Sequence, residues 1–111
     1  MSLSTHVLDA MRGEPAAGVG VRLEVAADDG WKALATTRTG ADGRVRDVLS
    51  GHLTRGPHRL VFDTAAYFAD QGIDEFFYPE VAVSFFIADP AVHYHVPLLL
   101  SPFAYSTYRG S

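Results

Sequence analysis

The chain has 111 residues, 48% of them apolar, and a formal net charge of −4 from nine basic and thirteen acidic residues. This length fits one domain, residues 1–111, with an ordinary apolar core. The acidic balance argues against a nucleic-acid-binding protein, which needs a concentrated basic patch. The lack of cysteine excludes disulfides, thiolate metal sites and cysteine nucleophiles.

The N-terminal segment lacks the basic region and apolar stretch of a signal peptide. No apolar run approaches the roughly 20 residues that span a bilayer. We therefore expect a cytoplasmic protein that does not bind membranes.

Short runs of alternating apolar and polar residues, separated by Gly, Pro and Asp, predict β-strands along most of the chain. The first extended segment carries His6 on the face opposite Thr5 and Val7. His6 is then either a partly exposed strand residue or a base or ligand at a cleft. Further strands are predicted over residues 19–25, 31–38, 44–49, 58–63, 79–87, 92–100 and 103–108.

One helix is predicted over residues 64–72, with Thr64 as its N-cap and Gly72 as its C-terminal stop. Seven or eight short strands in a chain of this length indicate an all-β protein. The expected architecture is a two-sheet β-sandwich interrupted by one short helix.

A His-x-His pair lies in the last long predicted strand. Residues two apart in a strand point the same way, so His93 and His95 share a face. We expect that face to point outward or into a subunit interface. The spacing also suits zinc, but zinc needs a third ligand, which His6 could supply in principle. The opposite face is apolar and is the natural core side: Val92, Tyr94, Val96, Leu98 and Leu100.

An arginine follows the turn Asp42-Gly43. Arg44 is either a solvated surface residue or a bidentate clamp for an anion. Arg46 shares its face by alternation and is a competing candidate. The chain contains no nucleophile elbow of a Ser-His-Asp hydrolase and no glycine-rich phosphate loop.

Four segments of the chain resemble one family: residues 4–16, 42–44, 62–80 and 93–111. They read Ser-Thr-His-Val-Leu-Asp near the start, Asp-Gly-Arg, Phe-Phe-Tyr-Pro-Glu, and His-Tyr-His-Val-Pro-Leu-Leu-Leu-Ser-Pro followed by a terminal Tyr-Arg-Gly-Ser. On these motifs the chain is similar to the transthyretin-like 5-hydroxyisourate hydrolases.

The resemblance implies a transthyretin-like sandwich that assembles as a homotetramer, a dimer of dimers, with active sites between the dimers. It implies hydrolysis of 5-hydroxyisourate to 2-oxo-4-hydroxy-4-carboxy-5-ureidoimidazoline in urate degradation, with no cofactor and no metal. The family's catalytic positions fall on His6, Arg44, His95 and Ser111, and its substrate contacts on His6, Arg44 and Tyr108. His93 is expected to be structural or to support a catalytic residue.

These residue types suit the hydrolysis of a cyclic amide-like bond. A neutral imidazole, His6 or His95, can take the proton of the attacking water, while the other orients that water or protonates the leaving nitrogen. Arg44 can hold the substrate and offset the charge on the carbonyl oxygen. The sequence leaves open which histidine is the base.

The C-terminal segment is expected to run back beside the strand that carries His95. This would bring Tyr108 and the carboxylate of Ser111 near the same cleft, with Gly110 allowing a close approach. A C-terminal tag is then expected to impair catalysis more than folding.

Three alternatives remain open. The first is a carrier, as vertebrate transthyretin is on this fold, since fold alone does not decide function. The carriers lack the set of His6, Arg44, His95 and the Tyr-Arg-Gly-Ser end. The others are a zinc hydrolase that uses His6, His93 and His95, and an interaction module without chemistry.

Overall fold

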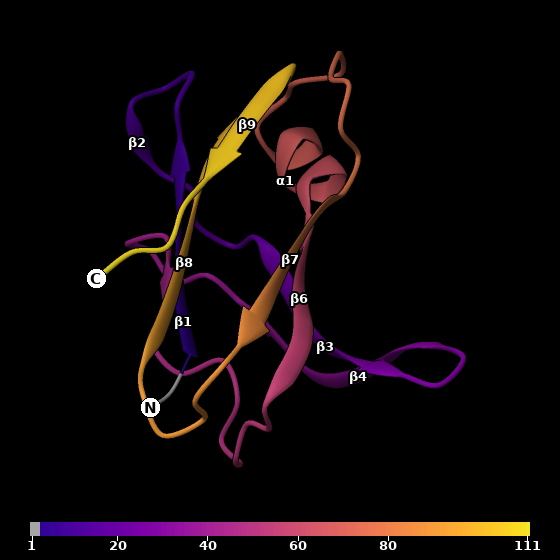
Figure 1. Ribbon diagram of the computed structural model, residues 1–111. Helices are drawn as coiled ribbons and strands as arrows, with labels where there is room; N and C mark the ends of the chain where they lie inside the picture. Colours follow the sequence, from indigo (N-terminus) through magenta and orange to yellow (C-terminus); the bar gives the residue numbers. More distant parts are fainter. Residues whose placement is uncertain (1–2) are drawn as a thin grey trace.

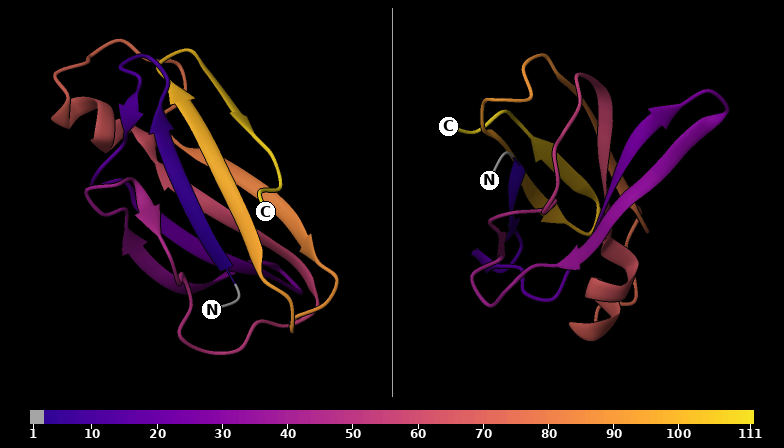
Figure 2. Two further views of the ribbon diagram at one scale, coloured as in Figure 1. Left: turned by 90° about the vertical axis from the view of Figure 1, so that its left-hand side faces the viewer. Right: turned by 90° about the horizontal axis from the view of Figure 1, so that it is seen from below.

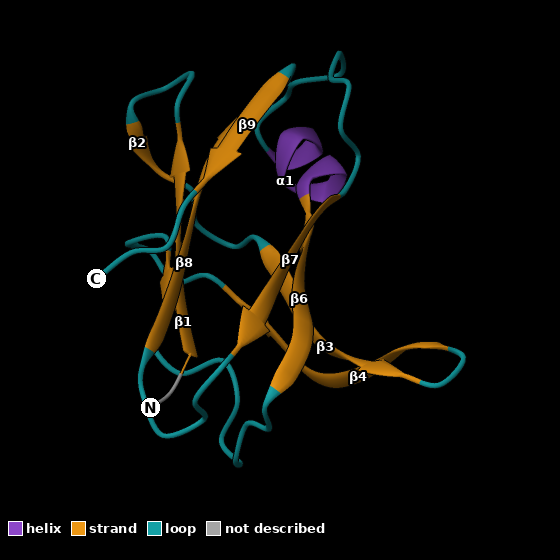
Figure 3. Cartoon of the chain, viewed as in Figure 1, coloured by secondary structure: helices purple, strands orange, loops and turns teal. Residues whose placement is uncertain are grey.

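The computed structural model describes residues 3–111 as strands, loops and one short helix (Figures 1 and 3). Seven strands have four or more residues, and two have only two. The elements in chain order are β1 Leu3–Asp9, β2 Glu14–Pro15, β3 Gly20–Ala27, β4 Gly30–Arg38, β5 Arg44–Val45, β6 Gly56–Asp63, α1 Thr64–Asp70, β7 Val81–Ile87, β8 Tyr94–Ser101 and β9 Ala104–Thr107.

The strands form two facing sheets, which confirms the predicted sandwich. One sheet has the order β2-β1-β8-β9, with β5 also paired to β1, and the other has the order β4-β3-β6-β7. The left panel of Figure 2 shows the first sheet in front of the second. Strands β1 and β8 are parallel, although they lie at opposite ends of the sequence. This pairing brings the first and last motifs of the chain together.

The core lies between the sheets, and its residues follow the predicted alternation. In β1, Leu3, Thr5 and Val7 are fully buried, while the intervening residues are only half-buried. In β8, the predicted core side is buried from Tyr94 to Leu100. The hydroxyl of Thr5 is satisfied in the core because it donates to the carbonyl oxygen of Val96 at 2.6 Å. The other face of β1 and of β8 therefore points away from the core, toward the outside of the sandwich.

The predicted strand over residues 44–49 is wrong beyond Val45. The side chain of Arg46 turns back to Asp42 at 2.8 Å, and the amide of Val48 donates to the carbonyl oxygen of Leu3 at 3.0 Å. Beyond Val45 these two contacts, and not continued strand pairing, hold the chain near the start of β1.

The predicted N-cap is also wrong by one residue. Asp63 caps α1, because its carboxylate accepts the amide hydrogen of Ala66 at 3.2 Å. Thr64 is the first residue of the helix and is fully buried, with its hydroxyl donating to the carbonyl oxygen of Tyr78 at 2.5 Å. The helix ends at Asp70, just before Gly72, whose φ of 73° favours glycine.

The helix is fixed to the end of β1 by a buried hydrogen bond. The hydroxyl of Tyr67 donates to the carboxylate of Asp9 at 2.6 Å, and that carboxylate also accepts the amide hydrogens of Met11 and Arg12. Asp9 is only 2% exposed. Within residues 3–111, no helix is long and apolar enough to cross a membrane.

Candidate active site

The outer face of the first sheet carries both predicted histidines. In the parallel pairing of β1 with β8, Ser4 lies beside His95 and His6 beside Pro97. Because side chains alternate, Ser4, His6 and His95 all project from the face opposite the core, and all three are half-buried. The outward orientation predicted for the histidine face is confirmed.

Arg44 is brought to the same face by a tight turn. It opens β5 and lies directly opposite His6, and the carboxylate of Asp42 accepts its amide hydrogen at 3.1 Å. Gly43 has a φ of 76°, and a Cβ there would collide with the carbonyl oxygen of Val7. The Asp-Gly-Arg motif therefore has a physical reason, since only glycine lets this turn lie so close to β1.

The structure separates the two competing arginines. Arg46 lies beyond β5, and its guanidinium is held by Asp42. Hydrogen bonds from Arg46 and from the amide of Arg44 lower the pKa of Asp42, which keeps the turn's carboxylate charged. Arg44 is the arginine whose charge acts on His95.

A serine links the two histidines of the His-x-His pair. The Oγ atom of Ser4 lies 2.7 Å from Nδ1 of His95 and 2.9 Å from Nε2 of His93. The sequence prediction gave Ser4 no role. Its position two residues before His6 was the available signal, because alternation places both residues on one face.

The pKa of His95 lies below its ordinary value of 6.5. Burial is the largest cause, and the positive charge of Arg44 is the second. Both effects disfavour the imidazolium form. His95 is therefore neutral at physiological pH and has a ring nitrogen able to take a proton.

The C-terminal segment runs back along β8, as predicted. The hydroxyl of Thr107 donates to the carbonyl oxygen of Pro97 at 2.6 Å. The amide of Gly110 donates to the carbonyl oxygen of His95 at 2.9 Å. A Cβ on Gly110 would collide with the ring of His95. The glycine thus permits the close approach that the sequence suggested.

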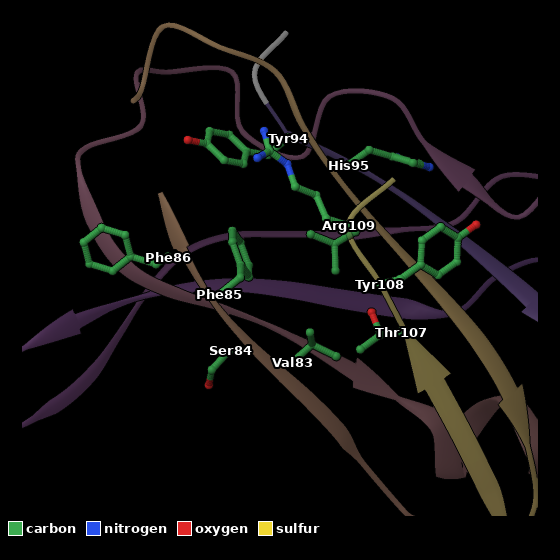
Figure 4. A pocket seen from close by; sticks show the side chains of 10 residues that line it. Val83, Ser84, Phe85, Phe86, Tyr94, His95, Thr107, Tyr108 and Arg109 are labelled. Carbon is green, nitrogen blue, oxygen red and sulfur yellow. The ribbon is translucent and has the colours of Figure 1, made fainter. Parts of the chain in front are cut away.

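Arg109 and Tyr108 project to different sides of this segment (Figure 4). The guanidinium of Arg109 lies over the ring of Tyr94, 4.6 Å from its centre, and attaches the segment to the start of β8. Tyr108 is 59% exposed. Ser111 is also exposed and follows Gly110, so it lies within one residue of the contact with His95.

A cavity of about 230 Å³ lies beside this segment, between β7 and β8. Its wall includes Phe85 and Phe86 of β7, opposite His95, Tyr108 and Arg109 (Figure 4). Neither His6 nor Arg44 lines it. Of the three residues that meet on the outer face, His95 therefore reaches the cavity, whereas His6 and Arg44 do not.

No group of three His, Cys, Asp or Glu side chains within residues 3–111 is placed to hold a metal ion. The side chains of His93 and His95 instead share Ser4 as a hydrogen-bond partner. Within the described residues, His6, His93 and His95 therefore do not form the ligand set that the zinc alternative requires.

Comparisons with known proteins agree on one family. The model of the HIUase/Transthyretin family matches residues 3–110. A 5-hydroxyisourate hydrolase of Salmonella typhimurium is 47% identical over 110 residues, covering 98% of this chain and 80% of that protein. The solved Klebsiella pneumoniae 5-hydroxyisourate hydrolase is 37% identical, with a TM-score of 0.86 over 99% of this chain and 93% of that one. Transthyretin from Sparus aurata is 34% identical, with a TM-score of 0.89 over 97% and 95%.

Proposed function

The chain belongs to the HIUase/Transthyretin family, and on that basis we propose that it is a hydrolase that opens the ring of 5-hydroxyisourate in purine degradation. Its relatives at 45–47% identity over nearly the whole chain carry that name. We further propose that residues 1–111 form one hydrolase domain, and that it acts in the cytoplasm without cofactor or metal.

The observation that carries this proposal is the meeting of His6, Arg44 and His95 on one outward face. His6 lies opposite Arg44 in the sheet, and the charge of Arg44 reaches His95. Two imidazoles supply a base and a second polar group for the attacking water. A guanidinium beside them supplies a fixed positive charge for an oxyanion.

The proposed reaction is an attack of water on the ring's acyl carbon. As the oxygen–carbon bond forms, one imidazole takes a proton from the water, and Arg44 offsets the charge on the carbonyl oxygen. The carbon–nitrogen bond then breaks, and the leaving nitrogen takes a proton. The new carboxyl group ionises, giving 2-oxo-4-hydroxy-4-carboxy-5-ureidoimidazoline. Tyr108 binds the substrate, and Ser111 completes the site from the C-terminal segment.

We also propose that the enzyme is a homotetramer, a dimer of dimers. In the single chain β9 and β7 are edge strands on the same side of the sandwich, and unpaired edges favour pairing with another strand. Each edge strand exposes a large apolar side chain, Phe86 on β7 and Tyr105 on β9. Edge pairing in a first dimer leaves the histidine face for a second dimer to cover. A monomer by light scattering, with full activity, would refute this assembly.

A carrier is the second candidate, because a solved sea bream transthyretin in complex with thyroxine is 35% identical with a TM-score of 0.90. The two functions make different demands on the histidine face. A carrier needs shape and apolar contact, whereas a hydrolase needs the proton-transfer groups. Binding of thyroxine without turnover of 5-hydroxyisourate would favour the carrier.

The proposed site is tested by substituting its residues and measuring turnover in variants that still fold. His6→Ala, His95→Ala and Arg44→Ala are each expected to lower turnover by about 10²–10⁴-fold, while the circular dichroism spectrum stays unchanged. His52→Ala is the matched control, since His52 is an exposed histidine that lies on neither β1 nor β8. Full activity after dialysis against a chelator is expected if no metal takes part. Near wild-type turnover in both His6→Ala and His95→Ala would contradict the proposed mechanism.

A further inference from the structure

Three side chains form a continuous hydrogen-bonded chain at the edge of the proposed site. His95 contacts Ser4 through Nδ1 at 2.7 Å, and Ser4 contacts His93 through Nε2 at 2.9 Å. His93 is exposed, whereas Ser4 and His95 are half-buried. The chain therefore runs from solvent to the ring of His95.

The hydroxyl group at the centre limits how the hydrogens can be arranged. A serine has one hydrogen to donate and two lone pairs that accept. To link both histidines, the hydroxyl of Ser4 therefore donates to one imidazole ring and accepts a hydrogen from the other. If it donates to His95, the neutral ring carries its hydrogen on Nε2 and offers no lone pair there. If it accepts from His95, Nδ1 carries the hydrogen and Nε2 is free to act as a base.

The geometry favours the arrangement in which Ser4 accepts, because Ser4 occupies Nδ1 of His95 and leaves Nε2 as the nitrogen that can reach a water molecule. An interaction with the main chain of Ser4, which opposes the lowering of the pKa of His95, agrees with it. A main-chain group that stabilises the protonated ring must accept a hydrogen from it. The side of the ring that faces Ser4 thus lies against hydrogen-bond acceptors.

We infer that His95 is the general base, acting through Nε2, and that Ser4 and His93 are positioning residues that hold His95 in the Nδ1–H form. In this arrangement the Nδ1 hydrogen of His95 is donated to Ser4, and the hydroxyl hydrogen of Ser4 is donated to Nε2 of His93. The inference rests on the proposed hydrolysis and assigns the base within it.

The proton transfers balance over one turnover. Nε2 of His95 takes a proton from water as the oxygen bonds to the acyl carbon, and Ser4 accepts from the imidazolium formed. As the carbon–nitrogen bond breaks, Nε2 returns that proton to the leaving nitrogen. The other proton of the water leaves when the carboxyl group ionises. His95 ends in its starting form, and His6 is left to orient the water.

The charged and titratable groups around His95 fit this role. Arg44 on β5, His6 on β1 and His93 before β8 each disfavour its protonated form. Arg109 of the C-terminal segment is turned to the ring of Tyr94. The ring thus returns its proton readily once the leaving nitrogen is available.

The direct test is the tautomer of His95, read from the ¹⁵N spectrum of histidine-labelled protein. In the wild-type chain we expect hydrogen on Nδ1 and a lone pair on Nε2. In Ser4→Ala we expect loss of this preference, and in Ser4→Thr its retention, because threonine keeps the hydroxyl. Hydrogen on Nε2 of His95 in the wild-type protein at neutral pH would overturn the inference, whatever the activity.

Kinetics supply the second readout. Ser4→Ala is expected to lower kcat about tenfold or more, the effect of losing one hydrogen bond to a catalytic group, and to change KM less than twofold. Ser4→Thr is expected to restore kcat. His93→Leu is expected to lower kcat severalfold, while His93→Gln, which retains a hydrogen-bond acceptor, lowers it less. His52→Ala controls for loss of an exposed histidine.

The outcomes separate this inference from the proposed function. If the wild-type protein does not accelerate 5-hydroxyisourate decay, the proposed function fails, while the tautomer test still decides the orientation of His95. If the wild-type protein is active but Ser4→Ala and His93→Leu keep its kcat, the inference fails and the function stands. If Ser4→Ala does not fold, the tautomer in the wild-type protein and the two His93 variants decide.

Discussion

The amide of Gly110 donates a hydrogen bond to the carbonyl oxygen of His95 at 2.9 Å. The α-carbon of Gly110 also lies so close to the imidazole that a Cβ would overlap it. The last residues of the chain therefore form one wall around a catalytic candidate from β8. The geometry gives the glycine of the Tyr-Arg-Gly-Ser motif a steric role.

Gly110→Ala is expected to lower kcat/KM by about 10²-fold, because the added methyl group must displace the ring of His95 or the C-terminal segment. The unfolding midpoint is expected to change little, since the contact lies on the outer face of the sheet. Gly51→Ala is the matched control, as a Cβ there meets no neighbour within 4 Å. Equal kcat/KM in the two variants would show that this contact does not matter.

Arg109→Met is expected to raise KM about twofold to fivefold. The cation–π contact with Tyr94 is worth about 0.5–1 kcal/mol at an exposed site, and its loss frees the segment that carries Tyr108. Arg55→Met is the control, because it removes a contact of the same kind, with the ring of Phe86 at 5.1 Å, from a different segment of the chain. Steady-state kinetics on both variants measure the difference, and a KM unchanged in Arg109→Met speaks against an anchoring role.

Arg44→Gln is expected to raise the pKa of His95, because the variant removes a positive charge that disfavours the imidazolium. The base must be neutral, so activity falls as pH drops through this pKa. In the wild-type enzyme that fall lies below the ordinary value of 6.5, and in Arg44→Gln it moves to higher pH.

An NMR titration of His95 measures this shift without relying on turnover. Arg46→Gln is the control, since the guanidinium of Arg46 is held by Asp42 and is not among the principal charges that lower the pKa of His95. A pKa of His95 that stays the same in Arg44→Gln contradicts the placement of Arg44 beside it.

Tyr67→Phe is expected to lower the free energy of unfolding by about 1–3 kcal/mol, because it removes a hydroxyl donor from the buried carboxylate of Asp9. Burial, together with the hydrogen bond to Asp9, raises the pKa of Tyr67, so the donor persists to high pH. Urea unfolding measures the change, with Tyr105→Phe at an exposed position as the control. At a temperature at which Tyr67→Phe and Tyr105→Phe are both folded, we expect their turnover to equal that of the wild-type protein.

Local alternation predicted much of the site. It placed His6 and His95 on outward faces correctly, because side-chain direction in a strand has a fixed period of two. It also gave each long strand to within a few residues. It overextended the strand after Arg44, because a salt bridge from Arg46 to Asp42 and a bond from Val48 to Leu3 end it early.

Other features depend on pairing between distant parts of the chain. The parallel register of β1 with β8 sets Ser4 beside His95 across 91 positions of sequence. No local pattern specifies this register, because it follows from packing two sheets over a shared core. The preference between Arg44 and Arg46 also depends on a distant contact, the close approach of the turn at Gly43 to Val7 of β1. Ser4 received no role for this reason.

The most direct test is the decay of freshly prepared 5-hydroxyisourate, followed by ultraviolet absorbance with and without the protein. At micromolar protein we expect decay well above the spontaneous rate, with His95→Ala reduced by at least about 10²-fold. Decay at the spontaneous rate with folded wild-type protein would contradict the claim that His6, Arg44 and His95 form a hydrolase site.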